Sequence, residues 1–268
     1  MIIKQHSLVA YFALTFMLFW GSLVIGRIPG FGFFAPIAGA LAPCVAALVV
    51  TGLAEGEHGV RALVRRLAAW RVAPTWYVIA LGLPIAGWLI AVAVATLLRA
   101  FSEADLRMAI PVLMTSWIMF LFAAVEELGW RGFALPRLLA IRSGLAASVI
   151  LGTLHAIWHW PAVVPASAWT DIPRLVPGLL RGTTHIVAEA VLLTWIFQHT
   201  RGSLLPVTLY HGMSNVALVL YQGIQHMPWL RPSISVLIAT SVVLTIGPNL
   251  VRAPRVRGHV RQKALHES

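Results

Sequence analysis

The amino-acid sequence predicts an all-α membrane protein, a polytopic transmembrane helix bundle of about eight spans. Of the 268 residues, 59% are hydrophobic and only 11% are charged, whereas a soluble domain has about 25% charged residues. The mean hydropathy is +0.83. Apolar stretches recur along the chain, and many reach the roughly 20 residues that a helix needs to cross a bilayer.

Polar segments and prolines separate eight apolar stretches. The first is longer than the apolar part of a secretory signal peptide, so we expect it to be retained as a helix. The second contains Pro36 and Pro43, which favour a kink or a re-entrant path. The expected spans are Leu8–Ile28, Phe31–Leu53, Thr75–Leu98, Ile110–Leu128, Gly144–Val164, Thr183–Phe197, Leu204–Tyr221 and Ser233–Val251.

The basic residues predict the orientation of this bundle. With eight spans and the N-terminus in the cytoplasm, 14 of the 20 Lys and Arg residues fall on cytoplasmic segments. This bias follows the positive-inside rule and predicts that both termini are cytoplasmic. It also accounts for the net charge of +11, so we expect the lipid bilayer, and no nucleic acid, as a partner. A composition rich in Ala, Arg, Leu and Val favours a bacterial cytoplasmic membrane.

The chain divides into an integral membrane domain, residues 1–251, and a basic cytoplasmic tail, residues 252–268, which we expect to be disordered and membrane-associated. Within the first, Gly56–Arg71 is either an amphipathic helix on the cytoplasmic surface or an ordinary basic loop. Its apolar stripe consists of Val60, Leu63, Val64 and Leu67. Cys44 is the single cysteine, which rules out an intramolecular disulfide.

The stretch Leu121–Arg137, LFAAVEELGWRGFALPR, places two adjacent carboxylates in an apolar run. A carboxylate in hydrocarbon costs roughly 2.5–3.5 kcal/mol on insertion scales, so such residues usually have a function. On a helix, Glu127 and Arg131 are spaced i, i+4 and are expected to form an ion pair. Glu126 points about 100° away around the helix. We therefore expect Glu126 to be available for chemistry.

Three further polar pairs fall in apolar runs, and each is spaced i, i+4, so its members share a helix face. They are His155 and His159, His185 and Glu189, and His211 and Asn215. A buried carboxylate beside histidines suits hydrolysis, in which the acid takes a proton from water, a histidine assists, and donors such as an amide stabilise the oxyanion. Alternatively, each pair only forms hydrogen bonds between helices.

The motifs of other intramembrane proteases are missing from the sequence. There is no HExxH and no Gly-x-Gly-Asp, and Asp105 and Asp171 both fall in expected loops. Ser148 and Ser214 have no Gly-x-Ser-x-Gly frame, which argues against a serine nucleophile.

Taken in order, Glu126-Glu127-x-x-x-Arg131, the histidine of WHWP, and His211-x-x-x-Asn215 resemble the motifs of the CPBP intramembrane proteases. This family includes the type II CAAX prenyl endopeptidases and bacterial Abi and bacteriocin-immunity-type proteins. The resemblance covers a core of about residues 117–219. It implies a helix bundle with a catalytic cavity facing the cytoplasm, and a protein or peptide substrate in or at the membrane.

The resemblance also implies roles for individual residues. Glu126 corresponds to the acid that activates water, with His159 assisting, and His211 and Asn215 correspond to the oxyanion-binding pair. Glu127 and Arg131 occupy motif positions with a more structural role.

The second motif usually begins with an aromatic residue, but this chain has His155 there. Either His159 is the catalytic histidine or the roles shift by one turn, and the Trp-His-x-Pro context favours His159. His185 and Glu189 are not motif residues, and they either bond to each other or line the cavity.

The family has been described both as metalloproteases and as glutamate-dependent enzymes without a metal. Glu126, His159 and His211 offer one oxygen and two nitrogen ligands, a set found at catalytic zinc sites. In that case Glu126 would be a ligand and not the free base. We expect metal-free water activation with no cofactor, and zinc or another divalent metal is the alternative.

Three functions fit these observations. The ordered motifs favour an intramembrane endopeptidase. Intramembrane acids and histidines also serve as relays in proton-coupled transporters, and a non-catalytic immunity or scaffold protein would use the cavity to bind a membrane partner. A prenylated substrate is not predicted from these residues.

Overall fold

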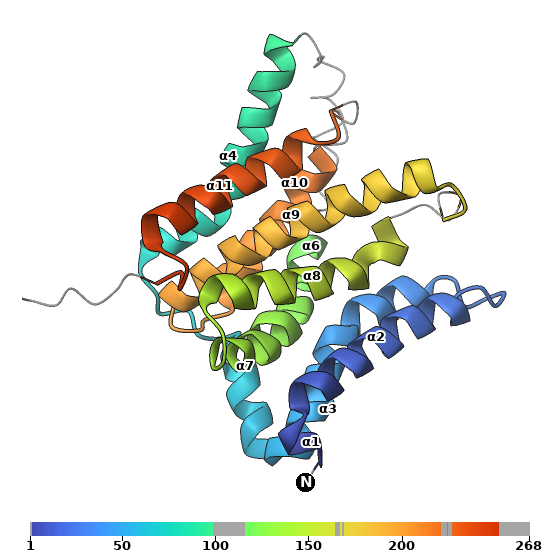
Figure 1. Cartoon of the computed structure of the whole chain (residues 1–268). Helices are drawn as coiled ribbons and strands as arrows, with labels where there is room; N and C mark the ends of the chain where they lie inside the picture. Colours follow the sequence, from blue (N-terminus) through green and yellow to red (C-terminus); the bar gives the residue numbers. More distant parts are fainter. Residues whose placement is uncertain are drawn as a thin grey trace, which may run out of the picture.

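The computed structural model describes residues 2–98, 116–163, 167, 169–220, 224 and 227–251. Within these ranges every regular element is helical (Figure 1), which confirms the predicted all-α class. The elements are α1 (Ile2–Gln5), α2 (Ser7–Ile25), α3 (Phe34–Arg65), α4 (Pro74–Leu97), α6 (Trp117–Glu127), the π-helical segment η1 (Leu128–Ala134), α7 (Leu135–Leu139), α8 (Gly144–Val163), α9 (Ile172–His199), α10 (Leu205–Leu220) and α11 (Leu230–Ile246).

Each expected span overlaps one of these helices. By length and composition, α2, α4, α9 and the Ile37–Arg65 part of α3 are long and apolar enough to cross a membrane, and α10 and α11 are shorter apolar helices. The chain is therefore an integral membrane protein. The start of the fourth expected span, Asp105 and the basic tail lie outside the described residues.

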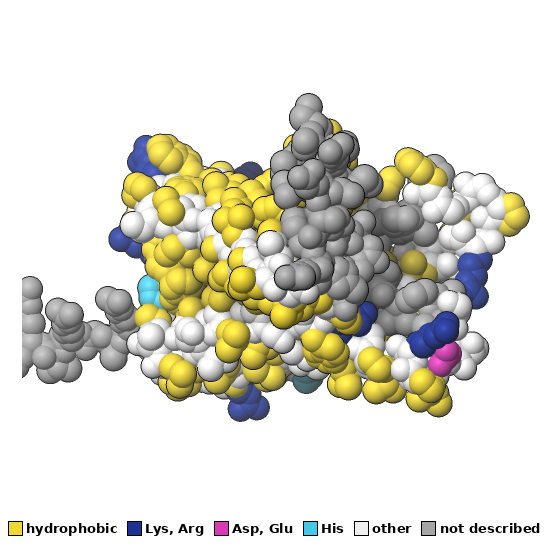
Figure 2. Space-filling model, turned by 90° about the horizontal axis from the view of Figure 1, so that it is seen from above, with side chains coloured by type: hydrophobic (Ala, Val, Ile, Leu, Met, Phe, Trp, Pro, Cys, Tyr) yellow, Lys and Arg dark blue, Asp and Glu magenta, His cyan; other side chains and the backbone are white. Residues whose placement is uncertain are grey.

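The outer surface of the bundle is apolar. Figure 2 shows one face on which hydrophobic side chains cover wide areas, while basic side chains are few. Large apolar residues on α4 and α11 are among the most exposed, with Leu97 82% and Leu244 80% exposed. Such a surface is stable in contact with lipid chains and costly in water.

Small residues allow α2 and α3 to pack closely. Ala42 and Ala46 of α3 are buried, and a Cβ on Gly39 would lie 2.4 Å from the Phe19 ring of α2. Close approach through small residues is typical of helices that pack within membranes.

The second expected span, for which the prolines favoured a kink or a re-entrant path, is one helical element that continues through both prolines. The backbone keeps helical φ and ψ angles through Pro43, and it leaves them at Gly56, where φ is +70°. A positive φ is accessible to glycine without a steric penalty. The helix break therefore lies between the membrane span and the predicted amphipathic segment.

The segment after Gly56 is helical up to Arg65, which confirms the helical alternative for its first part. The apolar stripe of this segment does not face lipid along its whole length. Leu63 is buried in the protein core and Leu67 packs against that core, whereas Val64 is exposed.

The segments that the charge bias assigns to the cytoplasm lie together at one end of the bundle. The Leu204 amide donates to the Arg66 carbonyl at 3.0 Å, and the Leu145 amide donates to the Pro248 carbonyl at 2.8 Å. Arg137 of α7 pairs with Glu55 at the end of the α3 span. These bonds join the α3–α4 connection to the α9–α10 connection, and the start of α8 to the segment after α11.

The segment α6–η1–α7 crosses the centre of the bundle, and all seven residues of η1 are buried. Gly129 in η1 lies against α3 and α2, because a Cβ at this position would be 2.4 Å from the Pro43 carbonyl oxygen and 2.6 Å from the Tyr11 hydroxyl. Short π-helical segments often occur at functional sites. This close packing fixes the position of the two carboxylates that precede η1.

Gly129→Ala is expected to lower the stability of the protein by about 1–3 kcal/mol, because overpacking against backbone forces a shift of α3. The matched control is Gly87→Ala in α4, where the new Cβ would meet Ile234 at an ordinary 3.6 Å. Thermal unfolding in detergent measures both variants. Equal melting temperatures for Gly129→Ala and the wild type would contradict the packing of η1 on α3.

Candidate active site

Glu127 and Arg131 form the ion pair that their spacing predicts. The Arg131 Nη1 atom lies 2.7 Å from Glu127 Oε1, and the two side chains are 1% and 0% exposed. A buried pair of this kind stabilises a fold only when its remaining polar atoms also find partners.

His211 of α10 is the second partner of Glu127. Its Nδ1 lies 2.8 Å from Glu127 Oε1, and because a carboxylate can only accept, His211 donates from Nδ1. Glu127 thus links η1 to α10 and orients the His211 ring. The expected ion pair between Glu127 and Arg131 is present, and His211 is a further member of the same network.

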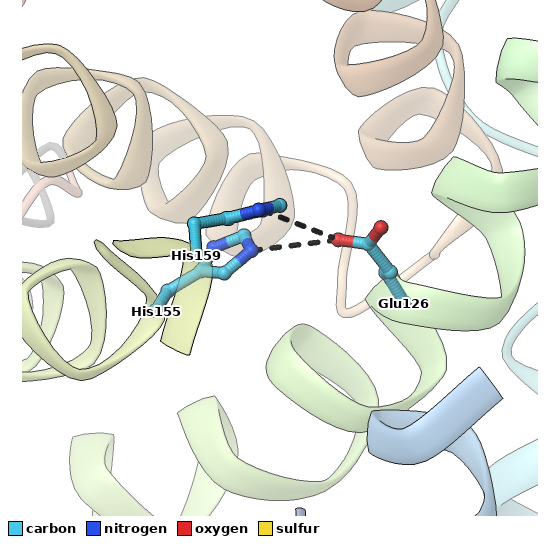
Figure 3. Close-up of side chains that lie close together, drawn as sticks. All are labelled: Glu126, His155 and His159. Atoms are coloured by element: carbon cyan, nitrogen blue, oxygen red, sulfur yellow. Dashed lines mark ion pairs between the residues drawn. The ribbon is translucent and has the colours of Figure 1, made fainter. Parts of the chain in front are cut away.

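Glu126 points to the other side, toward α8 (Figure 3). Its Oε2 atom lies 3.4 Å from His155 Nε2 and 4.0 Å from His159 Nε2. Glu126 is 7% exposed. Both histidines therefore face the carboxylate, and the one at the unusual motif position, His155, is the nearer.

Aromatic rings hold His155 in place. Its ring lies over Trp130 of η1, with centroids 4.5 Å apart and an interplanar angle of 31°, and Trp158 lies 5.8 Å away. Trp130 and Trp158 are buried. Sequence analysis did not identify this role for either tryptophan, since a tryptophan in an apolar helix has no distinctive spacing.

A cavity of about 320 Å³ lies beside these groups. Its polar lining includes His155, His159, His211 and Asn215, contributed by α8 and α10. Glu126 is not among the lining residues, but it faces the two histidines of α8 that are. The structure thus brings together the acid, the histidines and the amide that the motifs predict for one site.

His185 and Glu189 of α9 line the same cavity. They are joined through Ser235, whose hydroxyl lies 3.1 Å from His185 Nδ1 and donates to Glu189 Oε1 at 3.0 Å. Ser214 donates to Glu189 Oε2 at 2.8 Å. This cluster connects α9 with α10 and α11 beside Asn215, and the two serines were not predicted because their spacing carries no signal.

The residues whose atoms could bind one metal ion differ from the predicted set of Glu126, His159 and His211. Among the described residues, Glu126, His155 and His159 offer three ligand atoms that all lie within 4.8 Å of one another. His211 is not part of this group, and its Nδ1 is bound to Glu127. One oxygen and two imidazole nitrogens suit zinc and related divalent ions.

The cavity is lined by residues of η1, α8, α9, α10 and α11 and of the segment between α10 and α11. In α9 these residues run from Gly178 to Leu193, and in α10 from His211 to Leu218.

Breaking the buried ion pair by Arg131→Ala is expected to cost about 3–5 kcal/mol of stability, because the Glu127 carboxylate stays buried. Arg61→Ala is the matched control, since Arg61 and Glu57 have the same i, i+4 spacing but are 65% and 79% exposed. An exposed pair contributes about 0.5 kcal/mol or less. Denaturant titration in micelles compares the two, and similar losses would contradict the buried pair.

Single cysteines at positions 201 and 228, in a Cys44→Ser background, are expected to react with a membrane-impermeant thiol reagent from opposite faces of the membrane. The reason is that α10 separates the turn at residue 201 from the segment at residue 228. Labelling of intact and permeabilised cells measures this. Labelling of both positions from one face would refute a membrane-crossing α10, and the face that reaches position 228 identifies the side of the cavity.

Comparison with known proteins points to one family. The family model described as type II CAAX prenyl endopeptidase Rce1-like matches residues 107–217. A relative named CAAX prenyl protease 2, from Methanococcus maripaludis, is 25% identical over 137 residues, which are 50% of this chain. The chain covers 49% of that relative's length. The matched residues 107–217 include all three ordered motifs, so over this stretch the chain is similar to the CPBP-type proteases.

Proposed function

We propose that this protein is an intramembrane endopeptidase that hydrolyses a peptide bond with water activated by Glu126. One observation carries the proposal. The buried Glu126 carboxylate faces two histidines that line a cavity, and the His211–Asn215 face of α10 lines the same cavity. A base, assisting groups and oxyanion donors are therefore available around one space.

In the proposed reaction, Glu126 Oε2 takes a proton from water as the water oxygen bonds to the substrate carbonyl carbon. His159 orients this water, as the resemblance implies. His155 lies closer to Glu126 than His159 does, so it contributes to the same side of the site. The proton then passes from Glu126 to the leaving amine as the carbon–nitrogen bond breaks.

The tetrahedral intermediate carries a negative charge on the former carbonyl oxygen. Asn215 offers amide N–H donors for this oxygen, and His211 lies one turn before it on α10. Glu127 accepts from His211 Nδ1 and so leaves Nε2 to face the cavity. Donors that are already oriented stabilise such a charge without reorganising during the reaction.

A metal is compatible with the donor set, and Glu126, His155 and His159 would hold it. A bound divalent ion would supply Lewis-acid activation of water. Our first choice remains the metal-free route, in which Glu126 itself is the base and no cofactor is required.

The proposed substrate is a protein or peptide in or at the membrane. Apolar side chains, including Leu193, Leu218 and Ile224, form much of the cavity wall, which suits an apolar peptide segment. The relative's name refers to a CAAX prenyl protease, but we do not extend a prenylated substrate to this chain.

Glu126→Gln is expected to lower cleavage by about 10²–10⁴-fold, because the amide keeps the volume of the carboxylate but cannot accept the proton. The assay measures hydrolysis of a fluorogenic peptide library by detergent-purified protein, with and without a strong chelator. Under the metal-free proposal, the chelator leaves wild-type activity unchanged.

Glu57→Gln is the matched control, since Glu57 is an exposed residue of α3 and its loss should leave cleavage unchanged. Retained activity in Glu126→Gln would refute the proposed base. Activity lost on chelation would replace the metal-free route by the metal-dependent one, and no cleavage of any library member would favour the binding or transport alternatives.

A further inference from the structure

We propose that Glu126, His155 and His159 form a binding site for one divalent first-row transition-metal ion such as Zn²⁺. This site differs from the set Glu126, His159 and His211 that the motif positions imply. The proposal concerns binding and does not depend on proteolysis by the protein.

The distances suit a single ion. Zinc bonds of about 2.0–2.2 Å place two ligand atoms of a tetrahedral site roughly 3.4 Å apart. Glu126 Oε2 and His155 Nε2 are already 3.4 Å apart, and Glu126 Oε2 and His159 Nε2 are 4.0 Å apart. Only His159 has to move closer, and its side chain is the most exposed of the three at 26%.

The donor atoms are not used by other groups. Among the described residues, Glu126 Oε2 and both ring nitrogens of His155 are buried without a hydrogen-bond partner. Buried polar atoms usually find a partner, and one ion bound between Glu126 and His155 would supply a partner to Glu126 Oε2 and to one ring nitrogen of His155. The donor set of one carboxylate oxygen and two imidazoles selects a transition ion over Mg²⁺ or Ca²⁺, which prefer oxygen ligands.

Packing fixes the geometry of the site. His155 and His159 are spaced i, i+4 on α8, so both project from one face of the helix. Stacking on Trp130 fixes the His155 ring, whereas most metal-binding histidines are held by a hydrogen bond to the second nitrogen. Three protein ligands leave one coordination position, and the cavity that His155 and His159 line gives access to it.

Metal binding and base catalysis use the same carboxylate. Glu126 Oε2 cannot coordinate an ion and also take a proton from water, so the metal-bound and metal-free forms are alternative states of one site. His155 determines which state is accessible, because an aromatic residue at that position would leave only two ligands.

The test is titration of the purified, tag-free chain in detergent with Zn²⁺, in competition with a chromophoric zinc chelator. The wild type is expected to bind one equivalent. His155→Phe, which keeps a ring beside Trp130, is expected to bind at least about tenfold more weakly, since loss of a direct ligand exceeds the usual effect of losing an outer partner. His185→Asn is the matched control, because His185 lines the same cavity outside the proposed site, and it should bind as the wild type does.

Three results would overturn the proposal: no binding by the wild type, unchanged binding by His155→Phe, or an equal loss in His185→Asn. The chain has 10 histidines, so the control separates this site from binding elsewhere. Co²⁺ substitution of the wild type gives a readout that needs no variant. An intense tetrahedral visible spectrum is expected, and a weak octahedral spectrum would contradict the site.

Failure of this inference and failure of the proposed function are distinguishable. If zinc does not bind but Glu126→Gln abolishes peptide cleavage, the metal site is wrong and the endopeptidase proposal stands. If zinc binds with the expected dependence on His155 but no peptide is cleaved, the metal site stands and the endopeptidase proposal is wrong.

Discussion

The centre of the bundle depends on the interactions of the buried Glu127 carboxylate with its two partners. Glu127 accepts from Arg131 within η1 and from His211 on α10, and its side chain is 0% exposed. An unpaired carboxylate at this depth would be costly, so both partners must stay in place. The helix that carries the first motif is thereby fixed against the helix that carries the third.

The direction of Glu126 follows from this constraint. Consecutive residues on a helix point about 100° apart, so once Glu127 faces α10, Glu126 has to face another neighbour. That neighbour is α8, where His155 and His159 present their rings. One pair of adjacent acids thus faces two different neighbours, with Glu127 linking η1 to α10 and Glu126 facing the two histidines of α8.

Local spacing made part of this arrangement predictable. The Glu127–Arg131 pair needs only one helical turn, and the i, i+4 pairs on α8, α9 and α10 likewise depend on helix geometry alone. Apolar runs of spanning length predicted the helices themselves. The non-helical backbone at Gly56 was not predicted, whereas Pro43, where a kink or a re-entrant path was expected, keeps helical φ and ψ angles.

Contacts between segments far apart in the sequence could not be predicted from local spacing or apolar runs. His155 lies closer to Glu126 than His159 does because of the way α8 packs over η1. Trp130 fixes the position of His155 and belongs to a π-helical segment that has no sequence signature. Ser214 and Ser235, which bind Glu189, are common residue types whose role appears only when α9, α10 and α11 are assembled. The motifs therefore specify the chemical groups of the site, and the packing of helices from different parts of the chain specifies which group meets which. His155 stands where the resembling motif has an aromatic residue, and the packing of α8 brings it to Glu126 beside His159. Glu126 therefore has two imidazole neighbours, where an aromatic residue at position 155 would leave it one.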